Sequence, residues 1–159
     1  MSLPAYLFLY DENANQIKGG YVATGREGAI EVMNSSYGVM QNVNANTGSL
    51  TGTRIHAPYR IHKQIDKTSP YFSICVCENR RLQKALIKYY DINEAGVEYE
   101  IYRVTLDSIV IMSVNASHAY VPGSNNPNML EVIDIRYRGI EWFCLEGNIK
   151  YVDTWNKQP

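Results

Sequence analysis

The stretch IHKQIDKTSPYF, at residues 61–72, changes its pattern abruptly and so limits what the chain can form. Polar and apolar residues alternate from residue 57 to 65, which is typical of a half-buried strand. The apolar face of this strand carries Tyr59, Ile61 and Ile65. Lys63 falls on the same side and is the one charged residue on this apolar face. The alternation then stops at an acid–base pair followed by Thr-Ser-Pro.

The Thr-Ser-Pro sequence predicts the start of a helix. Ser69 is a good N-cap, Thr68 is a competing one, and Pro70 suits the first helical position, where a missing N–H costs nothing. We expect a helix over about residues 70–79 with one buried stripe. The stripe is formed by Phe72, Cys75 and Val76.

Two hypotheses account for the acid–base pair Asp66–Lys67, one catalytic and one structural. In the catalytic reading Asp66 is a general base, but adjacent residues at a strand end point in different directions. In the structural reading Asp66 accepts backbone N–H bonds at the turn or pairs with a charge on another subunit. We favour the structural reading for the whole strand-to-helix junction, which consists of Ile65, Asp66, Lys67, Thr68, Ser69 and Pro70.

Strand patterns occupy most of the remaining chain. We expect strands over residues 4–10, 29–41, 97–106, 108–115 and 130–143, with a bulge or a close backbone approach at Gly38. The apolar face of 97–106 changes phase partway, which indicates a bulge near residues 101–102. The core positions that we expect in and near the helix and the closing strand are Phe72, Ile133, Ile135, Tyr137, Ile140 and Trp142. About eight strands and one short helix predict a single all-β domain, a barrel or two-sheet sandwich over residues 1–159.

Composition excludes several classes of function. The net charge is −1, which marks no nucleic-acid partner. No apolar run is long enough to span a membrane, and MSLPAYLFLYDEN lacks the features of a signal peptide. Three cysteines, at positions 75, 77 and 144, argue against a disulfide framework and predict buried free thiols.

No catalytic or metal-binding motif stands out. The chain has no G-x-S-x-G, H-E-x-x-H or P-loop sequence. His56 and His62 lie six residues apart, roughly 20 Å along a strand, which is too far to share a metal. We therefore expect no cofactor and no metal. Two alternatives remain: a hydrolase with a hidden site at Cys144 or His62, and a stand-alone adhesin-like or lectin-like module suggested by 13 tyrosines.

Five segments, in order from about residue 29 to 156, resemble one family. The segments are GSLTGTRIHAPYRI, IDKTSPYF, YYDINEAGVEYEIYRVTLDSIVI, LEVIDIRYRGIEW and EGNIKYVDTW. They resemble the signature motifs of the haemolysin-coregulated proteins (Hcp), the tail-tube proteins of the bacterial type VI secretion system. Asp91 departs from the family pattern, which has arginine there.

The resemblance implies a fold, an assembly and a route out of the cell. The fold is a compact pair of sheets with one helix, like that of phage tail-tube proteins. Subunits form homohexameric rings, which stack into a tube inside a contractile sheath and meet a spike and a baseplate. Assembly occurs in the bacterial cytoplasm, and contraction secretes the tube without a signal peptide. Small effector proteins bind in the lumen, and no enzymatic activity is expected.

The resemblance also suggests site residues. The strand near residues 30–39 contributes to the channel wall, so Asn34, Ser35 and Ser36 become candidates for contact with effectors, Ser36 foremost. The polar stretch 42–53 matches an extended loop that contacts neighbouring subunits or the next ring. Its candidate contact residues are Asn42, Asn44, Asn46, Thr47, Gly48, Leu50 and Thr51.

Overall fold

A computed structural model describes residues 4–20, 27–120, 122–123, 125 and 129–155, and shows one long sheet folded back on itself. Its nine strands follow the order β2-β1-β8-β9-β10-β7-β4, with β11 beside β10 and β3 beside β1. A separate pair, β5-β6, completes the strands. The elements are β1 (Ala5–Tyr10), β2 (Gln16–Ile17), β3 (Ile30–Val32), β4 (Asn34–Ser36), β5 (Val39–Met40), β6 (Ile55–His56), β7 (Tyr59–Gln64), α1 (Ser69–Cys77), β8 (Arg81–Ile92), β9 (Glu98–His118), β10 (Met129–Cys144) and β11 (Ile149–Thr154).

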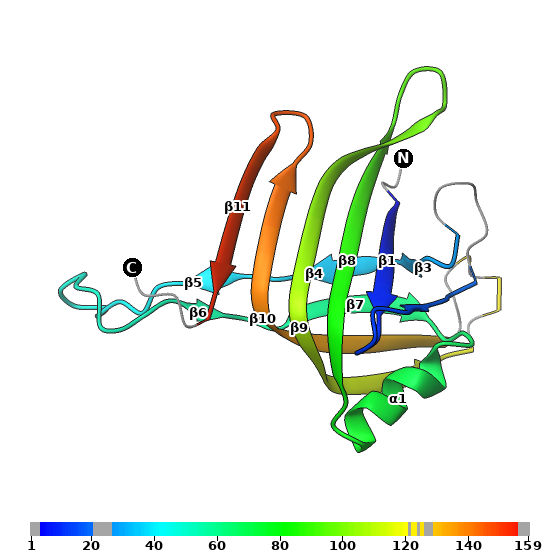
Figure 1. The fold of residues 1–159 in the computed structure, drawn as a ribbon, viewed down its shortest axis with the longest axis horizontal. Helices are drawn as coiled ribbons and strands as arrows, with labels where there is room; N and C mark the ends of the chain where they lie inside the picture. Colours follow the sequence, from blue (N-terminus) through cyan, green and yellow to red (C-terminus); the bar gives the residue numbers. More distant parts are fainter. Residues whose placement is uncertain (1–3, 21–26, 121, 124, 126–128, 156–159) are drawn as a thin grey trace.

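The two longest strands, β9 and β10, belong to both halves of the folded sheet. In Figure 1 they rise beside β8, β1 and β11, then bend to run with β7. Their pairing shifts register between Asp134 and Ile135, and Ser108 has a left-handed φ of 50° near the corner. Bulges bend strands and increase their twist, so this irregularity accounts for the fold-back. The predicted two-layer β architecture is confirmed.

The core lies between the two halves. We call the part of the sheet that contains β1, β8 and β11 the upright half, and the part that contains β4 and β7 the crossing half. The upright half contributes Leu7, Ile87 and Leu106 to the core, and the crossing half contributes Tyr59 and Ile61. All five are fully buried. The predicted core residues Phe72, Ile133, Ile135, Tyr137 and Ile140 are buried as expected. Trp142 differs, because it is only partly buried against this cluster.

The segment 29–41 does not form the single long strand that its pattern predicts. It divides into β3, which pairs with β1, β4, which pairs with β7, and β5, which pairs with β6. Met33 lies at the crossing between the two halves and is 47% exposed. The break therefore reflects tertiary pairing, which local alternation does not encode.

Residues 97–115 correct one prediction and confirm another. The predicted strand over 108–115 is a continuation of β9, not a separate strand. The predicted bulge is present, since Tyr89 pairs with Tyr102 and Tyr90 pairs with Glu100, leaving Ile101 between them. The bulge accounts for the change of phase.

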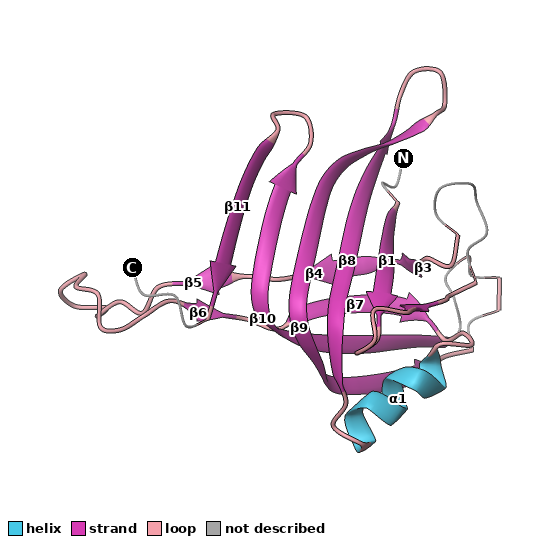
Figure 2. Ribbon diagram, viewed as in Figure 1, coloured by secondary structure: helices cyan, strands magenta, loops and turns pink. Residues whose placement is uncertain are grey.

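Helix α1 lies across the bent end of β9 (Figure 2). Phe72 and Cys75 are buried and Val76 packs partly on the core, which confirms the predicted stripe. The cap prediction is corrected: Thr68 holds the N-cap position without a side-chain cap bond, and Ser69 is the first helical residue. The Ser69 hydroxyl serves a different network, described below.

The three cysteines are free, as expected, but they differ in burial. Cys75 is buried, Cys77 is exposed and Cys144 is intermediate, so the prediction of burial holds for Cys75 alone. Within the described ranges, no helix is long and apolar enough to cross a membrane.

Candidate assembly surfaces

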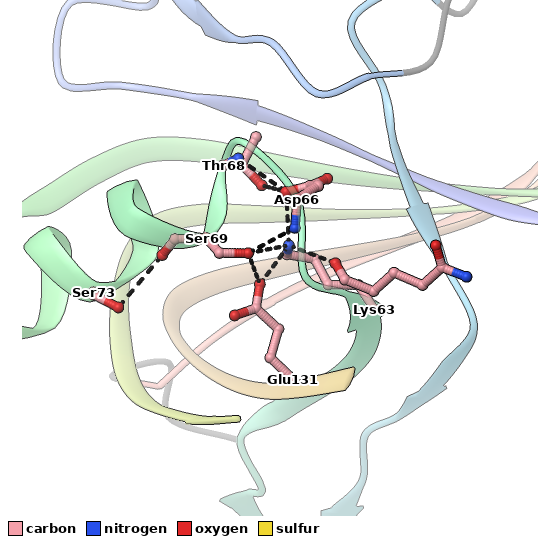
Figure 3. A network of polar contacts seen from close by, with 7 residues as sticks. Lys63, Asp66, Thr68, Ser69, Ser73 and Glu131 are labelled. Carbon is pink, nitrogen blue, oxygen red and sulfur yellow. Dashed lines mark hydrogen bonds and ion pairs between the residues drawn. The ribbon is translucent and has the colours of Figure 1, made fainter. Parts of the chain in front are cut away.

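Lys63, the misfit of the sequence pattern, lies at the strand-to-helix junction with its side chain completely buried. Its ammonium forms an ion pair with Glu131, which stands directly opposite on β10 and is 2% exposed (Figure 3). The same Nζ lies 3.0 Å from Asp66 Oδ1 and donates to the Gln64 carbonyl at 3.1 Å. Burying a charge costs several kcal/mol unless it is paired and hydrogen-bonded, and here both conditions are met.

Asp66 and Ser69 complete this network. Asp66 Oδ1 accepts the backbone N–H of Thr68 at 2.9 Å and its hydroxyl at 2.5 Å, which confirms the predicted turn role. Ser69 Oγ donates to Glu131 at 2.8 Å and accepts the Asp66 N–H at 2.9 Å. Burial alone raises the pKa of Asp66, but the bonds from Thr68 and Lys63 outweigh it and hold that pKa below its ordinary value.

The other junction residues take smaller parts. Lys67 is exposed, so the cation that pairs with Asp66 is Lys63 and not its neighbour. Ile65 is half-buried and donates its N–H to the Met129 carbonyl at 3.3 Å. Pro70 is exposed in the first turn of α1. The network joins β7, β10 and α1. The polar groups of Lys63, Asp66, Ser69 and Glu131 bond to one another and stabilise the junction.

Residues 42–53, called the arm from here on, project away from the body of the molecule (Figure 1). The arm, which was predicted as an extended loop, has backbone pairing of its own. Thr51 N–H donates to the Asn42 carbonyl, Asn44 N–H donates to the Ser49 carbonyl, and Val43 and Leu50 form a bridge. Asn42 is half-buried, and the other predicted contact residues are exposed: Asn44, Asn46, Thr47, Gly48, Leu50 and Thr51. The arm is thus an exposed hairpin available for contacts.

The base of the arm is clamped to β11 through Asp153. Arg54 donates to both carboxylate oxygens, at 2.6 and 2.7 Å, and also to the Thr154 carbonyl at 2.8 Å. His56 Nε2 lies 2.8 Å from Asp153, and His56 Nδ1 lies 2.8 Å from the Tyr137 hydroxyl. The Arg54 bonds lower the pKa of Asp153 to about 2, with His56 adding to the effect against the cost of burial.

The candidate lumen residues on β4 divide between two faces. Asn34 and Ser36 are exposed, whereas Ser35 is half-buried and its hydroxyl lies 2.8 Å from that of Tyr89. Ser35 therefore points into a tyrosine cluster in which Tyr89 also bonds Tyr59, and Tyr37 stacks on Tyr59 at 5.0 Å. Burial raises the pKa of Tyr59 far above its ordinary value, so its hydroxyl stays protonated. Only Asn34 and Ser36 remain candidates to face a channel.

Sequence reasoning missed the partners of both buried networks. Glu131 lies in a predicted strand and Asp153 in a segment that resembles the family, but neither was predicted to be the anion that pairs with Lys63 or Arg54. A lysine at an apolar strand position is the one local signal that a buried acid exists elsewhere. Among the described residues, no group of three or more histidine, cysteine, aspartate or glutamate side chains could hold a metal.

The fold and these surfaces are those of a β-sheet protein that can make contacts through an exposed arm and through the exposed residues of β4. The family model described as "Type VI secretion system effector, Hcp" matches residues 6–143. The chain belongs to this family of type VI secretion proteins. The family comprises structural secreted tube proteins, not enzymes.

Individual relatives match along nearly the whole chain. The solved structure of the Hcp1 protein from the E. coli EAEC 042 pathovar is 36% identical, has a TM-score of 0.88, and covers 97% of this chain and 99% of that one. The "Major exported protein" of Pseudomonas aeruginosa is 26% identical over 98% of this chain and 96% of its own length. The secreted protein Hcp3 from P. aeruginosa shares the fold, with a TM-score of 0.79, at 22% identity over 98% of this chain and 100% of that one.

Removing Lys63 alone is expected to be costly, because it leaves Glu131 buried without a cation. Lys63→Met should lower the free energy of unfolding by about 3–5 kcal/mol, and the double change Lys63→Met with Glu131→Leu should restore most of it. Urea denaturation measures both. Lys150→Met, which removes an exposed pair with Glu141, is the matched control and should cost less than about 1 kcal/mol. Equal losses in the single and double variants would contradict the assignment.

Asp153→Asn tests the clamp through its pH dependence. A carboxyl whose folded pKa is about 2, against an ordinary 3.8, stabilises the fold above pH 4 and loses that contribution as pH falls towards 2. The variant should therefore be less stable at pH 7 by about 2 kcal/mol, and the difference should narrow between pH 4 and 2. Glu78→Gln, in an exposed pair with Arg80, serves as the control. If the difference in free energy of unfolding between wild type and Asp153→Asn stayed constant down to pH 2, the proposed role of the Asp153 carboxylate would be wrong.

Proposed function

We propose that the chain is the subunit of the inner tube of a type VI secretion system. Subunits form homohexameric rings, the rings stack inside a contractile sheath, and the stack meets the spike and baseplate. Assembly takes place in the bacterial cytoplasm, and contraction releases the tube from the cell. The observation that carries this proposal is the match to the Hcp1 structure over 97% of the chain at 36% identity.

Two surfaces of this chain fit such a role. The arm is exposed and held at its base by the Asp153 clamp, which suits contact with a neighbouring subunit or with the next ring. Asn34 and Ser36 present small uncharged side chains from β4, which suits a channel wall that must not adhere strongly to its contents. Small effector proteins bind at this wall before delivery.

Shortening the arm tests assembly. Replacing residues 43–50 with Asn-Gly joins two positions that are already hydrogen-bonded neighbours, so the monomer should stay folded. The mass in solution should fall about sixfold, or stacking should be lost, because a cyclic ring needs its two complementary patches. Circular dichroism and native mass spectrometry measure the fold and the mass, and secretion is followed in the producing bacterium. Unchanged rings, stacking and secretion would show that the arm is not an interface.

Ser36→Gln tests the channel wall. The longer side chain should leave the rings intact but reduce the amount of effector retained when candidate effectors of the same secretion system are coexpressed. Ser73→Gln, at an exposed position on α1, is the control for added bulk. Normal retention by Ser36→Gln rings would place Ser36 outside the channel.

A further inference from the structure

The side of the crossing half that faces away from the core carries polar side chains in register. Directly paired residues point to the same side of a sheet, so the pairing of β4, β7, β10 and β9 places these side chains in two adjacent rows. One row contains Asn34, His62, Val132 and Asn115, and the other contains Ser36, Arg60, Asp134 and Ser113. We call these eight residues the polar face. It includes both β4 candidates for the channel wall and extends over four strands.

The permanent charges of the polar face cancel. Arg60 donates to both carboxylate oxygens of Asp134, at 2.8 and 3.1 Å, and Ser113 Oγ donates to the same carboxylate at 3.3 Å. The bond from Arg60 holds the pKa of Asp134 below its ordinary value, against the cost of burial. The carboxylate therefore stays ionised in weakly acidic solution, and the ion pair adds no net charge to the face.

His62 stands in the middle of this array. It is half-buried, with Asn34 opposite it on β4, Val132 opposite it on β10, and Arg60 next on the same side of β7. Of these neighbours only Arg60 is charged, and its charge is neutralised by Asp134. Histidine is the side-chain type that gains a charge between pH 8 and pH 5. Protonation of His62 therefore changes the polar face from neutral to singly positive in each subunit.

The other charged groups near His62 lie off the polar face. Lys63 and Glu131 point to the core side of β7 and β10 and pair with each other. Glu31, on β3, lies beyond the two rows, where it lines a pocket together with Gln64. Apart from the compensated ion pair, the array around His62 is therefore built from amide, hydroxyl and apolar side chains.

We propose that the polar face selects its contents by charge and that His62 sets this selectivity. With His62 neutral, the face offers amide and hydroxyl groups and no net charge, so it holds any protein surface weakly. With His62 protonated, the face attracts acidic protein surfaces and repels basic ones. This inference rests on the proposed function, because a ring brings the faces of all its subunits around one channel, where like charges reinforce one another. The partner class is an acidic effector surface in weakly acidic solution.

The test uses assembled rings of the full chain and a probe of defined charge. The probe is a short rhodamine-labelled peptide of alternating aspartate and serine, and fluorescence anisotropy measures its dissociation constant at pH 8 and pH 5.5. Aspartate keeps its charge over this range, so a change in affinity reports on the protein. Wild-type rings should bind this peptide at least fivefold more tightly at pH 5.5. A peptide of alternating lysine and serine should show the opposite trend.

Three histidine variants separate His62 from general effects of acid. His62→Gln keeps a polar side chain that gains no proton, so the change in affinity between the two pH values should fall below twofold. His62→Lys is charged at both pH values and should bind the aspartate peptide tightly at both. His118→Gln is the matched control, because His118 is exposed at the end of β9 and its pairing with Met129 puts it on the opposite side of the sheet. This variant should keep the wild-type dependence.

Wild-type rings give a second measurement that does not depend on any variant. Salt screens interactions between exposed charges, so 1 M NaCl should remove the pH dependence. Affinity that does not change with pH in wild-type rings, a pH dependence that survives in salt, or one that His62→Gln retains would overturn selection by charge and leave the tube function standing. If the wild type forms no rings at any concentration, the tube function is wrong and this inference is wrong with it.

Discussion

The buried ion pair between Lys63 and Glu131 is the constraint on which the rest of the molecule depends. The two residues are direct partners across β7 and β10, so the pair fixes the register of β7. A slip by one residue would turn the apolar face of β7 outward and leave the Lys63 ammonium away from its anion. Strand β7 in turn carries β4, and the chain between them forms the arm. The register of one strand thus determines where both candidate assembly surfaces are presented.

The long strands β9 and β10 explain why such surfaces exist. Because they serve both halves of the folded sheet, the shorter crossing layer leaves the upper part of the upright half uncovered. The uncovered part exposes Tyr151 and Ile149, and the arm exposes Val43 and Leu50. Apolar side chains that stay exposed in a single chain gain stability when another copy buries them, as the proposed assembly requires. The fold of this family and its proposed assembly therefore have one physical origin.

Local patterns predicted what depends on local chemistry. An apolar run predicted β1, alternation predicted β7, Ser-Pro predicted the start of α1, and the change of phase located the bulge at Ile101. Contacts between distant residues left no such trace. Lys63 was noted as a charged residue on an apolar strand face, but the sequence did not identify its partner. Nothing near Arg54 indicated Asp153, its partner 99 residues away. The division of 29–41 into three strands was missed for the same reason, since pairing with β1, β7 and β6 decides it. The choice of lumen residues came from resemblance to a family, and the burial of Ser35 narrows that choice.

Imaging the purified wild-type protein by negative-stain electron microscopy, with native mass spectrometry on the same sample, tests the central claim most directly. The account predicts six-membered rings with an open centre, at about six times the 18.1 kDa mass of the chain. A monodisperse monomer at high protein concentration would contradict it.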